Sequence, residues 1–351
     1  MQMKGERIII VKIRRMPAVR HCTEIRKERF AMEENTARKT FSRIGFAQVA
    51  GMVGTFLAGI FILQPAASGE NLQKTFAAIG ASGVLLLMYV PQIVYLLFYW
   101  LVVRTMPKAE WQKEKLGFRR LAEIFMMMYA VSSVLNQIGL AITKTAPAGG
   151  EFQLDLIAKM ESTRLPVAIA IPVVIGPILE ELIFRKFMLD RTRAYGEKTA
   201  IIFSAVCFGL FHGNLTQFLY AGCVGLFLGY VYCKTGKVLY TMIMHMLLNG
   251  TSSLILAVLP ILEQNQQDRV AIAFILIVLI LIILGGMTIA GFILLIRRIK
   301  QKRIVFDGTM PECIPQNEVL KTVWLNPGVI LLVILEGAEI IATLFNIELP
   351  F

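Results

Sequence analysis

The chain alternates between long apolar runs and short polar segments along most of its length. A helix needs roughly 18–20 apolar residues to cross the hydrocarbon core of a bilayer, and most of the runs approach or exceed that length. The pattern therefore predicts an all-α protein, a polytopic transmembrane helical bundle with about eight or nine spans. The predicted spans cover about 44–64, 80–102, 121–143, 167–189, 199–213, 215–233, 238–259, 270–296 and 327–346.

Two of these runs fit a simple span less well. The run 199–213 is short, and 327–346 contains Glu336 and Glu339 one helical turn apart, so this last segment can alternatively lie at the membrane interface. We divide the chain into four parts: a basic tail (1–43), N-terminal transmembrane helices (44–143), a core (167–259) and C-terminal transmembrane helices (270–351).

Composition and charge agree with a membrane protein. The sequence is 56% hydrophobic and 17% charged, whereas soluble domains are about a quarter charged. If the N-terminus is cytoplasmic, 31 of the 36 Lys and Arg residues fall in cytoplasmic segments and five on the other side. This asymmetry follows the positive-inside rule and predicts a multi-pass protein of the cell membrane, with the lipid bilayer as partner. The basic residues flank apolar runs, so we expect no nucleic-acid partner.

Small residues within the core are interpreted as packing positions. Ala221, Gly225 and Gly229 follow one another at four-residue steps, a spacing that lets transmembrane helices approach closely. The five cysteines form no CxxC pair, which argues against a disulfide framework or a thiolate zinc site.

The run 167–189 contains charged residues that are costly inside a membrane. A charged side chain at mid-bilayer costs roughly 2.5–3.5 kcal/mol on insertion scales, so such residues are functional candidates. Glu181 and Arg185 are four residues apart, which places them on one helix face where they can pair. Glu180 is rotated by about 100° from Glu181 and lacks this partner. Glu180 is therefore the candidate reactive carboxylate, and Glu181 with Arg185 the candidate support.

Two of the three histidines lie in predicted spans. His212 ends the run 199–213, and His245 lies in the run 238–259. Asn249 follows His245 by four residues, and Thr241 and Ser252 extend the same stripe at helical spacing. One face of this helix is polar, so we expect it to point into the bundle.

These groups together suit amide hydrolysis. A buried carboxylic acid beside an imidazole forms a general acid–base pair, and Asn or His side chains can donate hydrogen bonds to a developing oxyanion. A proton-coupled transporter could use the same residues as a relay. Two Glu and two His could also bind zinc, but they lack the H-E-x-x-H spacing and would have to converge from three helices. We therefore expect no metal cofactor, with zinc as the alternative.

Three motifs in this order resemble those of the CPBP family, the group of type II CAAX prenyl endopeptidases and bacterial Abi or bacteriocin-processing and self-immunity proteins. The motifs are Glu180-Glu181-x-x-x-Arg185, Phe208-x-x-x-His212 and His245-x-x-x-Asn249. The resemblance covers about 167–259. It departs from the family at Lys186, where glycine is common, and in having a ninth hydrophobic segment.

The resemblance implies a glutamate-dependent intramembrane protease acting on a membrane-associated peptide or lipidated protein. By this likeness, Glu180 would activate water with help from His212. His245 and Asn249 would stabilise the oxyanion, and Glu181 with Arg185 would support the site. A non-catalytic bacteriocin-immunity or scaffold protein that keeps the motifs is the alternative.

The expected depths of these residues conflict. Glu180 and His245 lie five to seven residues from the cytoplasmic ends of their runs, roughly 8–10 Å deep, whereas His212 lies about 13 residues along its run, roughly 20 Å deep. A single site requires the fifth helix to tilt strongly or to begin below the membrane surface.

Overall fold

The computed structural model describes residues 17–67, 89–109, 115–146, 171–262, 267–301 and 313–347, together with the single residues 74, 83 and 87. Within these ranges every element is a helix, which confirms the predicted all-α bundle. In chain order the elements are α1 (Pro17–Ala58), the π-helix η1 (Gly59–Leu63), α2 (Gln64–Ala67), α4 (Val90–Val103), α5 (Phe118–Thr145), the π-helix η2 (Ile171–Ile175), α8 (Gly176–Glu181), the π-helix η3 (Leu182–Leu189), α9 (Asp190–Thr192), the 3₁₀-helix η4 (Arg193–Tyr195), α10 (Glu197–Leu210), α11 (Leu215–Thr235), α12 (Val238–Leu262), α13 (Gln267–Lys300), the π-helix η5 (Leu320–Trp324) and α14 (Pro327–Phe345).

Each predicted apolar run overlaps a helix of the described residues, although the run 80–102 is described continuously only from residue 89. Several of these helices are long and apolar enough to cross a membrane, so the chain is a multi-pass membrane protein. Among the described residues they are Asn35–Leu63, Phe118–Thr145, Leu215–Thr235, Val270–Lys300 and Pro327–Phe345. The last of these is α14, whose length and composition therefore allow a span.

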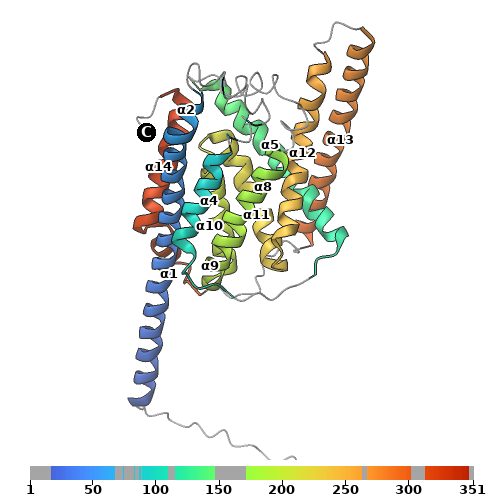
Figure 1. Ribbon diagram of the computed structural model, residues 1–351. Helices are drawn as coiled ribbons and strands as arrows, with labels where there is room; N and C mark the ends of the chain where they lie inside the picture. Colours follow the sequence, from blue (N-terminus) through green and yellow to red (C-terminus); the bar gives the residue numbers. More distant parts are fainter. Residues whose placement is uncertain are drawn as a thin grey trace, which may run out of the picture.

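Two helices from opposite ends of the chain lie side by side at one edge of the bundle (Figure 1). α1, in blue, runs beside α14, in red, and continues beyond the bundle, while α12 and α13 lie at the opposite edge. A Cβ atom at Gly45 of α1 would overlap the backbone of Gly328 in α14, so the two backbones approach closely here. The Gly328 N–H also donates to Ser42 Oγ at 3.1 Å. This crossing brings α14 into the bundle.

A helical hairpin with its turn at Gly196 positions two of the predicted site residues. Gly196 has φ 141°, a conformation that side chains disfavour, and it separates η4 from α10. Glu180 and His212 lie at equal numbers of residues before and after this turn. The two arms are joined by a hydrogen bond from Ser204 Oγ to the Phe184 carbonyl at 3.0 Å. The hairpin therefore holds the two arms side by side, and Glu180 and His212 line the same cavity.

The base of this hairpin, which the charge pattern placed in a cytoplasmic segment, is packed inside the protein. Asp190, Arg191, Arg193 and Glu197 are each at most 3% exposed. Asp190 accepts a hydrogen bond from the Tyr232 hydroxyl at 2.7 Å, and Arg193 pairs with Glu197 at 3.5 Å. The arm carrying Glu180 is thus longer, and α10 begins earlier, than the apolar runs suggest. Glu180 and His212 line one cavity even though the apolar runs placed them at different depths.

α10 and α11 pack closely through the small residues of α11. A Cβ atom at Gly225 would lie 2.8 Å from Ala205 Cα and 3.3 Å from the Phe208 ring. One at Gly229 would lie 3.2 Å from Ile201. The prediction that this stripe mediates helix packing is confirmed, and it fixes Phe208 next to α11.

Candidate active site

The two adjacent glutamates of α8 have different surroundings, as their spacing predicts. Glu181 Oε2 lies 2.9 Å from Arg185 Nε, and both side chains are fully buried. Glu180 is also largely buried but lines a cavity. The local pairing of Glu181 with Arg185 is therefore confirmed, and Glu180 is the carboxylate that faces open space.

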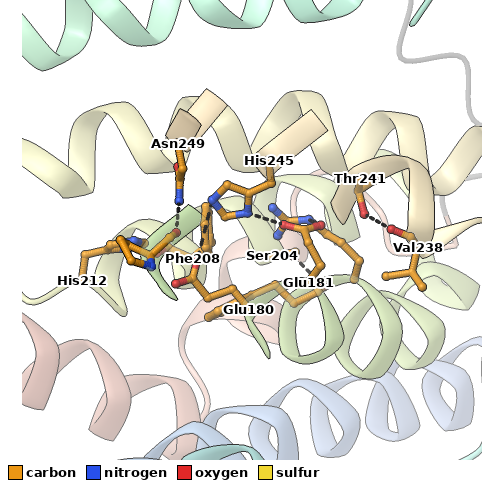
Figure 2. Close-up of polar contacts among 12 residues, drawn as sticks. Glu180, Glu181, Ser204, Phe208, His212, Val238, Thr241, His245 and Asn249 are labelled. Atoms are coloured by element: carbon orange, nitrogen blue, oxygen red, sulfur yellow. Dashed lines mark hydrogen bonds and ion pairs between the residues drawn. The ribbon is translucent and has the colours of Figure 1, made fainter. Parts of the chain in front are cut away.

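His245 on α12 lies between these two carboxylates (Figure 2). Its Nδ1 is 3.1 Å from Glu181 Oε1, and its Nε2 is 3.7 Å from Glu180 Oε2. The Glu181 carboxylate, which is paired with Arg185, accepts from Nδ1–H, and this directs Nε2 towards Glu180. Glu181 therefore orients His245, a contact that the spacing of residues within one helix could not reveal.

His212 lies in the turn after α10, where its ring is held by the preceding helix. His212 Nδ1 is 2.8 Å from the Phe208 carbonyl oxygen. Because a carbonyl only accepts, Nδ1 carries the hydrogen and Nε2 is available to the cavity. Asn214 also bonds this turn: its Nδ2 donates to the His212 carbonyl at 2.9 Å, and its Oδ1 caps α11 by accepting from Gln217 N–H at 2.9 Å.

The ring of Phe208 contacts most of the site. Its centroid lies 5.0 Å from that of His212 and 5.7 Å from that of His245 in edge-on arrangements. On the ring, the guanidinium carbon of Arg185 lies 4.8 Å from the centroid, within the range of a cation–π interaction. Phe208 thus fixes both imidazoles relative to Arg185, a role that its place in the motif did not specify.

Asn249 joins α12 to the π-helix η2. Its Nδ2 donates to the Pro172 carbonyl at 3.0 Å, leaving a second amide hydrogen. Thr241, one turn before His245, is buried, and its hydroxyl donates to the Val238 carbonyl at 2.9 Å. The predicted polar stripe is wrong at Ser252, which is exposed; it continues through Ser253, whose hydroxyl donates to the Asn249 carbonyl at 3.1 Å.

Four of the predicted residues line one cavity of about 1040 Å³: Glu180, His212, His245 and Asn249. The structure thus brings together, from α8, the turn after α10 and α12, residues that lie far apart in the sequence. Glu181 and Arg185 lie behind them. Several other polar residues line the same cavity and were not singled out as site residues by the sequence: Thr55, Tyr89, Gln92, Tyr95, Gln217, Tyr220, Glu336, Glu339 and Thr343.

α14 contributes to this cavity, although its sequence also allowed an interfacial position. Glu336 is 3% exposed and Glu339 lies one turn further along the helix. The Thr343 hydroxyl donates to the Gly213 carbonyl at 3.0 Å, so α14 also holds the turn that carries His212. The direction in which these side chains point depends on the crossing of α14 with α1, which local sequence patterns do not reveal.

Metal ligation was tested on the same geometry. Within the described residues, no three His, Cys, Asp or Glu side chains are grouped so that they could hold a metal ion. Glu180, Glu181 and His245 are close, but Glu181 is already engaged with Arg185 and with Nδ1 of His245.

Comparison with known proteins agrees with this geometry. Residues 162–251 match the Rce1-like family, described as type II CAAX prenyl endopeptidase Rce1-like. These matches support the resemblance of this part of the chain to the CPBP family. A protein of Bacillus subtilis (strain 168) named "Putative membrane peptidase YdiL" is 28% identical over 179 residues, which cover 48% of this chain and 70% of that protein. No solved structure matches the chain.

The resemblance predicted from the three motifs is thereby confirmed, because the matched segment contains all of them. The family model and the named relative both support a membrane peptidase at the level of the family. The matched segment ends before α13 and α14 begin, so the cavity wall supplied by α14 lies outside the matched segment.

Proposed function

We propose that this chain is an intramembrane endopeptidase that hydrolyses a peptide bond near the cytoplasmic leaflet, in a membrane-associated peptide or a lipidated protein. The observation that carries the proposal is the position of His245 between Glu180, which faces the cavity, and Glu181, which is paired with Arg185. A carboxylate at a cavity, an imidazole beside it and a buried group that orients the imidazole are the parts that general acid–base catalysis requires.

In this proposal Glu180 acts on a water molecule. The separation of 3.7 Å between Glu180 Oε2 and His245 Nε2 is longer than a direct hydrogen bond and suits a shared water. Glu180 takes a proton from the water as its oxygen attacks the peptide carbonyl carbon. When the C–N bond breaks, the same proton passes to the leaving amine, and Glu180 returns to its starting state.

The remaining motif residues are assigned by their free hydrogen-bonding positions. Neutral His212 has its hydrogen on Nδ1, so its Nε2 accepts from the attacking water and assists Glu180. The second amide hydrogen of Asn249 donates to the oxyanion. His245 Nε2 faces the same cavity and adds a second donor to the oxyanion when it carries a hydrogen, while Nδ1 stays on Glu181. This mechanism uses residues of the chain alone.

The test is cleavage of a degenerate peptide mixture by the full chain reconstituted in vesicles, read by mass spectrometry. Glu180→Gln should lower the rate by about 10²–10⁴-fold, the usual contribution of a general base. The matched control is Glu318→Gln, the same change near Lys321 and away from the cavity. Cleavage by Glu180→Gln at the control rate would reject the proposal.

The same preparation separates the alternatives. A bacteriocin-immunity or scaffold protein would keep its function in Glu180→Gln. A proton-coupled transporter would move solute in response to a proton gradient without cleaving peptide. Metal analysis of active protein, with and without chelator treatment, tests whether a metal contributes.

A further inference from the structure

Part of the cavity wall comes from helices outside the segment 162–251 that matches the family model. α1 supplies Thr55, α4 supplies Gln92 and Tyr95, and α14 supplies Glu336 and Glu339. These residues line the same cavity as Glu180 and His245, and the proposed mechanism gives them no role. They are therefore candidates for contact with a bound ligand.

Glu336 is the most unusual of these residues. Its side chain is 3% exposed, and no residue of the described ranges forms a hydrogen bond or ion pair with it. An acid inside a membrane-spanning helix carries a substantial insertion penalty and ordinarily faces a partner or a functional cavity. Glu181, in the same bundle, shows the structural solution, a buried ion pair. Glu336 lacks that solution and faces the cavity.

The two hydroxyl groups of this wall are already engaged as donors. The Tyr95 hydroxyl donates to Gln48 Oε1, and the Thr55 hydroxyl donates to the Pro91 carbonyl at 3.3 Å. In contrast, Gln92 Oε1 is buried and has no hydrogen-bond partner among the described residues. The wall therefore offers acceptors, the Glu336 carboxyl group and Gln92 Oε1, that its two hydroxyl groups do not satisfy. A ligand that only donates hydrogen bonds would complete it.

The charges around the cavity point to the same kind of ligand. Its described lining contains the carboxyl groups of Glu180, Glu336 and Glu339, and no lysine or arginine. In a low-dielectric site, a cation near unpaired carboxylates is attracted more strongly than in water. The unpartnered Gln92 oxygen and the Glu336 carboxyl group, with no lysine or arginine in the described lining, favour a donor that is also positively charged.

We propose that Glu336, assisted by Glu339 and Gln92, forms a subsite of the cavity that binds a lysine or arginine side chain of the substrate peptide. This inference rests on the proposed peptidase function, since it assigns the subsite to a substrate. The long apolar stem of either side chain suits the surrounding wall, and its cationic head meets the Glu336 carboxylate. Cleavage then occurs at a fixed distance from a basic residue.

The first test compares two degenerate peptide mixtures that are identical except that lysine in one is replaced by norleucine in the other. Wild type should cleave the lysine mixture with a kcat/KM about tenfold higher or more, as expected for a buried charge pair. In Glu336→Gln the ratio should fall to about one, whatever the absolute rate, and Glu336→Asp should restore part of it. Glu318→Gln should keep the wild-type ratio. A ratio near one in wild type, or a preference that persists in Glu336→Gln, would overturn the inference.

The second test needs no turnover and keeps Glu336 in place. In the Glu180→Gln protein, dicyclohexylcarbodiimide should label Glu336, and the lysine mixture should slow this labelling several-fold while the norleucine mixture does not. Equal labelling in the two mixtures would reject the subsite even if the enzyme cleaves peptides. Protection by lysine without any cleavage by wild type would instead keep the subsite and reject the peptidase.

Discussion

Breaking the buried pair of Glu181 and Arg185 should have unequal consequences depending on which partner is removed. Glu181→Gln leaves the Arg185 guanidinium fully buried over the Phe208 ring, with no carboxylate beside it. A guanidinium cannot lose its charge in a protein, so the full penalty of an uncompensated buried charge applies. Removal of one partner of such a pair typically costs about 3–5 kcal/mol.

Arg185→Met should cost less, about 1–3 kcal/mol. The remaining Glu181 still has His245 Nδ1 at 3.1 Å, and a carboxylate can be neutralised by taking up a proton. The double variant, Glu181→Gln with Arg185→Met, should be more stable than Glu181→Gln alone, because an apolar side chain then replaces the stranded charge.

The assay is reversible unfolding in mixed detergent micelles, with the three variants and wild type forming a double-mutant cycle. The order of stability should be wild type, Arg185→Met, then Glu181→Gln, with a large favourable coupling between the two positions. If Arg185→Met is as destabilising as Glu181→Gln, the pair does not behave as a buried charge held by its partner, and the reasoning is wrong.

Two further predictions concern helix packing and the turn that carries His212. Gly225→Ala should destabilise the protein by about 1–3 kcal/mol in the same unfolding assay, because its Cβ would lie 2.8 Å from Ala205 Cα. Gly222→Ala in the same helix is the control: its Cβ would lie 3.7 Å from the Ala205 carbonyl oxygen, so this change should be tolerated or stabilising. Asn214→Ala should cost about 0.5–2 kcal/mol of stability through loss of the α11 cap. It should also lower kcat/KM by more than this loss of stability explains, because the bond to the His212 carbonyl is removed as well. An unchanged kcat/KM would show that this bond does not position His212.

Much of the fold follows from local pattern. Apolar runs of membrane-spanning length predicted the helices, because in a bilayer the backbone must satisfy its own hydrogen bonds. The spacing of Glu181 and Arg185 predicted their pairing, since residues four apart share a helix face. The convergence of Glu180, His212, His245 and Asn249 on one cavity followed from their polarity within otherwise apolar helices.

The parts that escaped prediction depend on contacts between distant helices. The charged stretch after Arg185 resembles a cytoplasmic loop, yet its charges are buried by partners such as Tyr232 from α11. Helical periodicity alone does not show whether Glu336 faces lipid, interface or cavity, because that depends on the close crossing of α14 with α1. The contact between His245 and Glu181 likewise joins two helices and has no spacing signal.

The hairpin turn at Gly196 has a consequence for the length of this part of the chain. Adding one residue to either arm would move Glu180 or His212 by about 1.5 Å along its helix and rotate it by about 100°, which would turn one of them out of the cavity. We therefore expect that, among functional variants selected from a library of random single-residue insertions, insertions between these two residues are depleted. The polypeptide length between Glu180 and His212 is in this sense part of the site, as much as the side chains at its two ends.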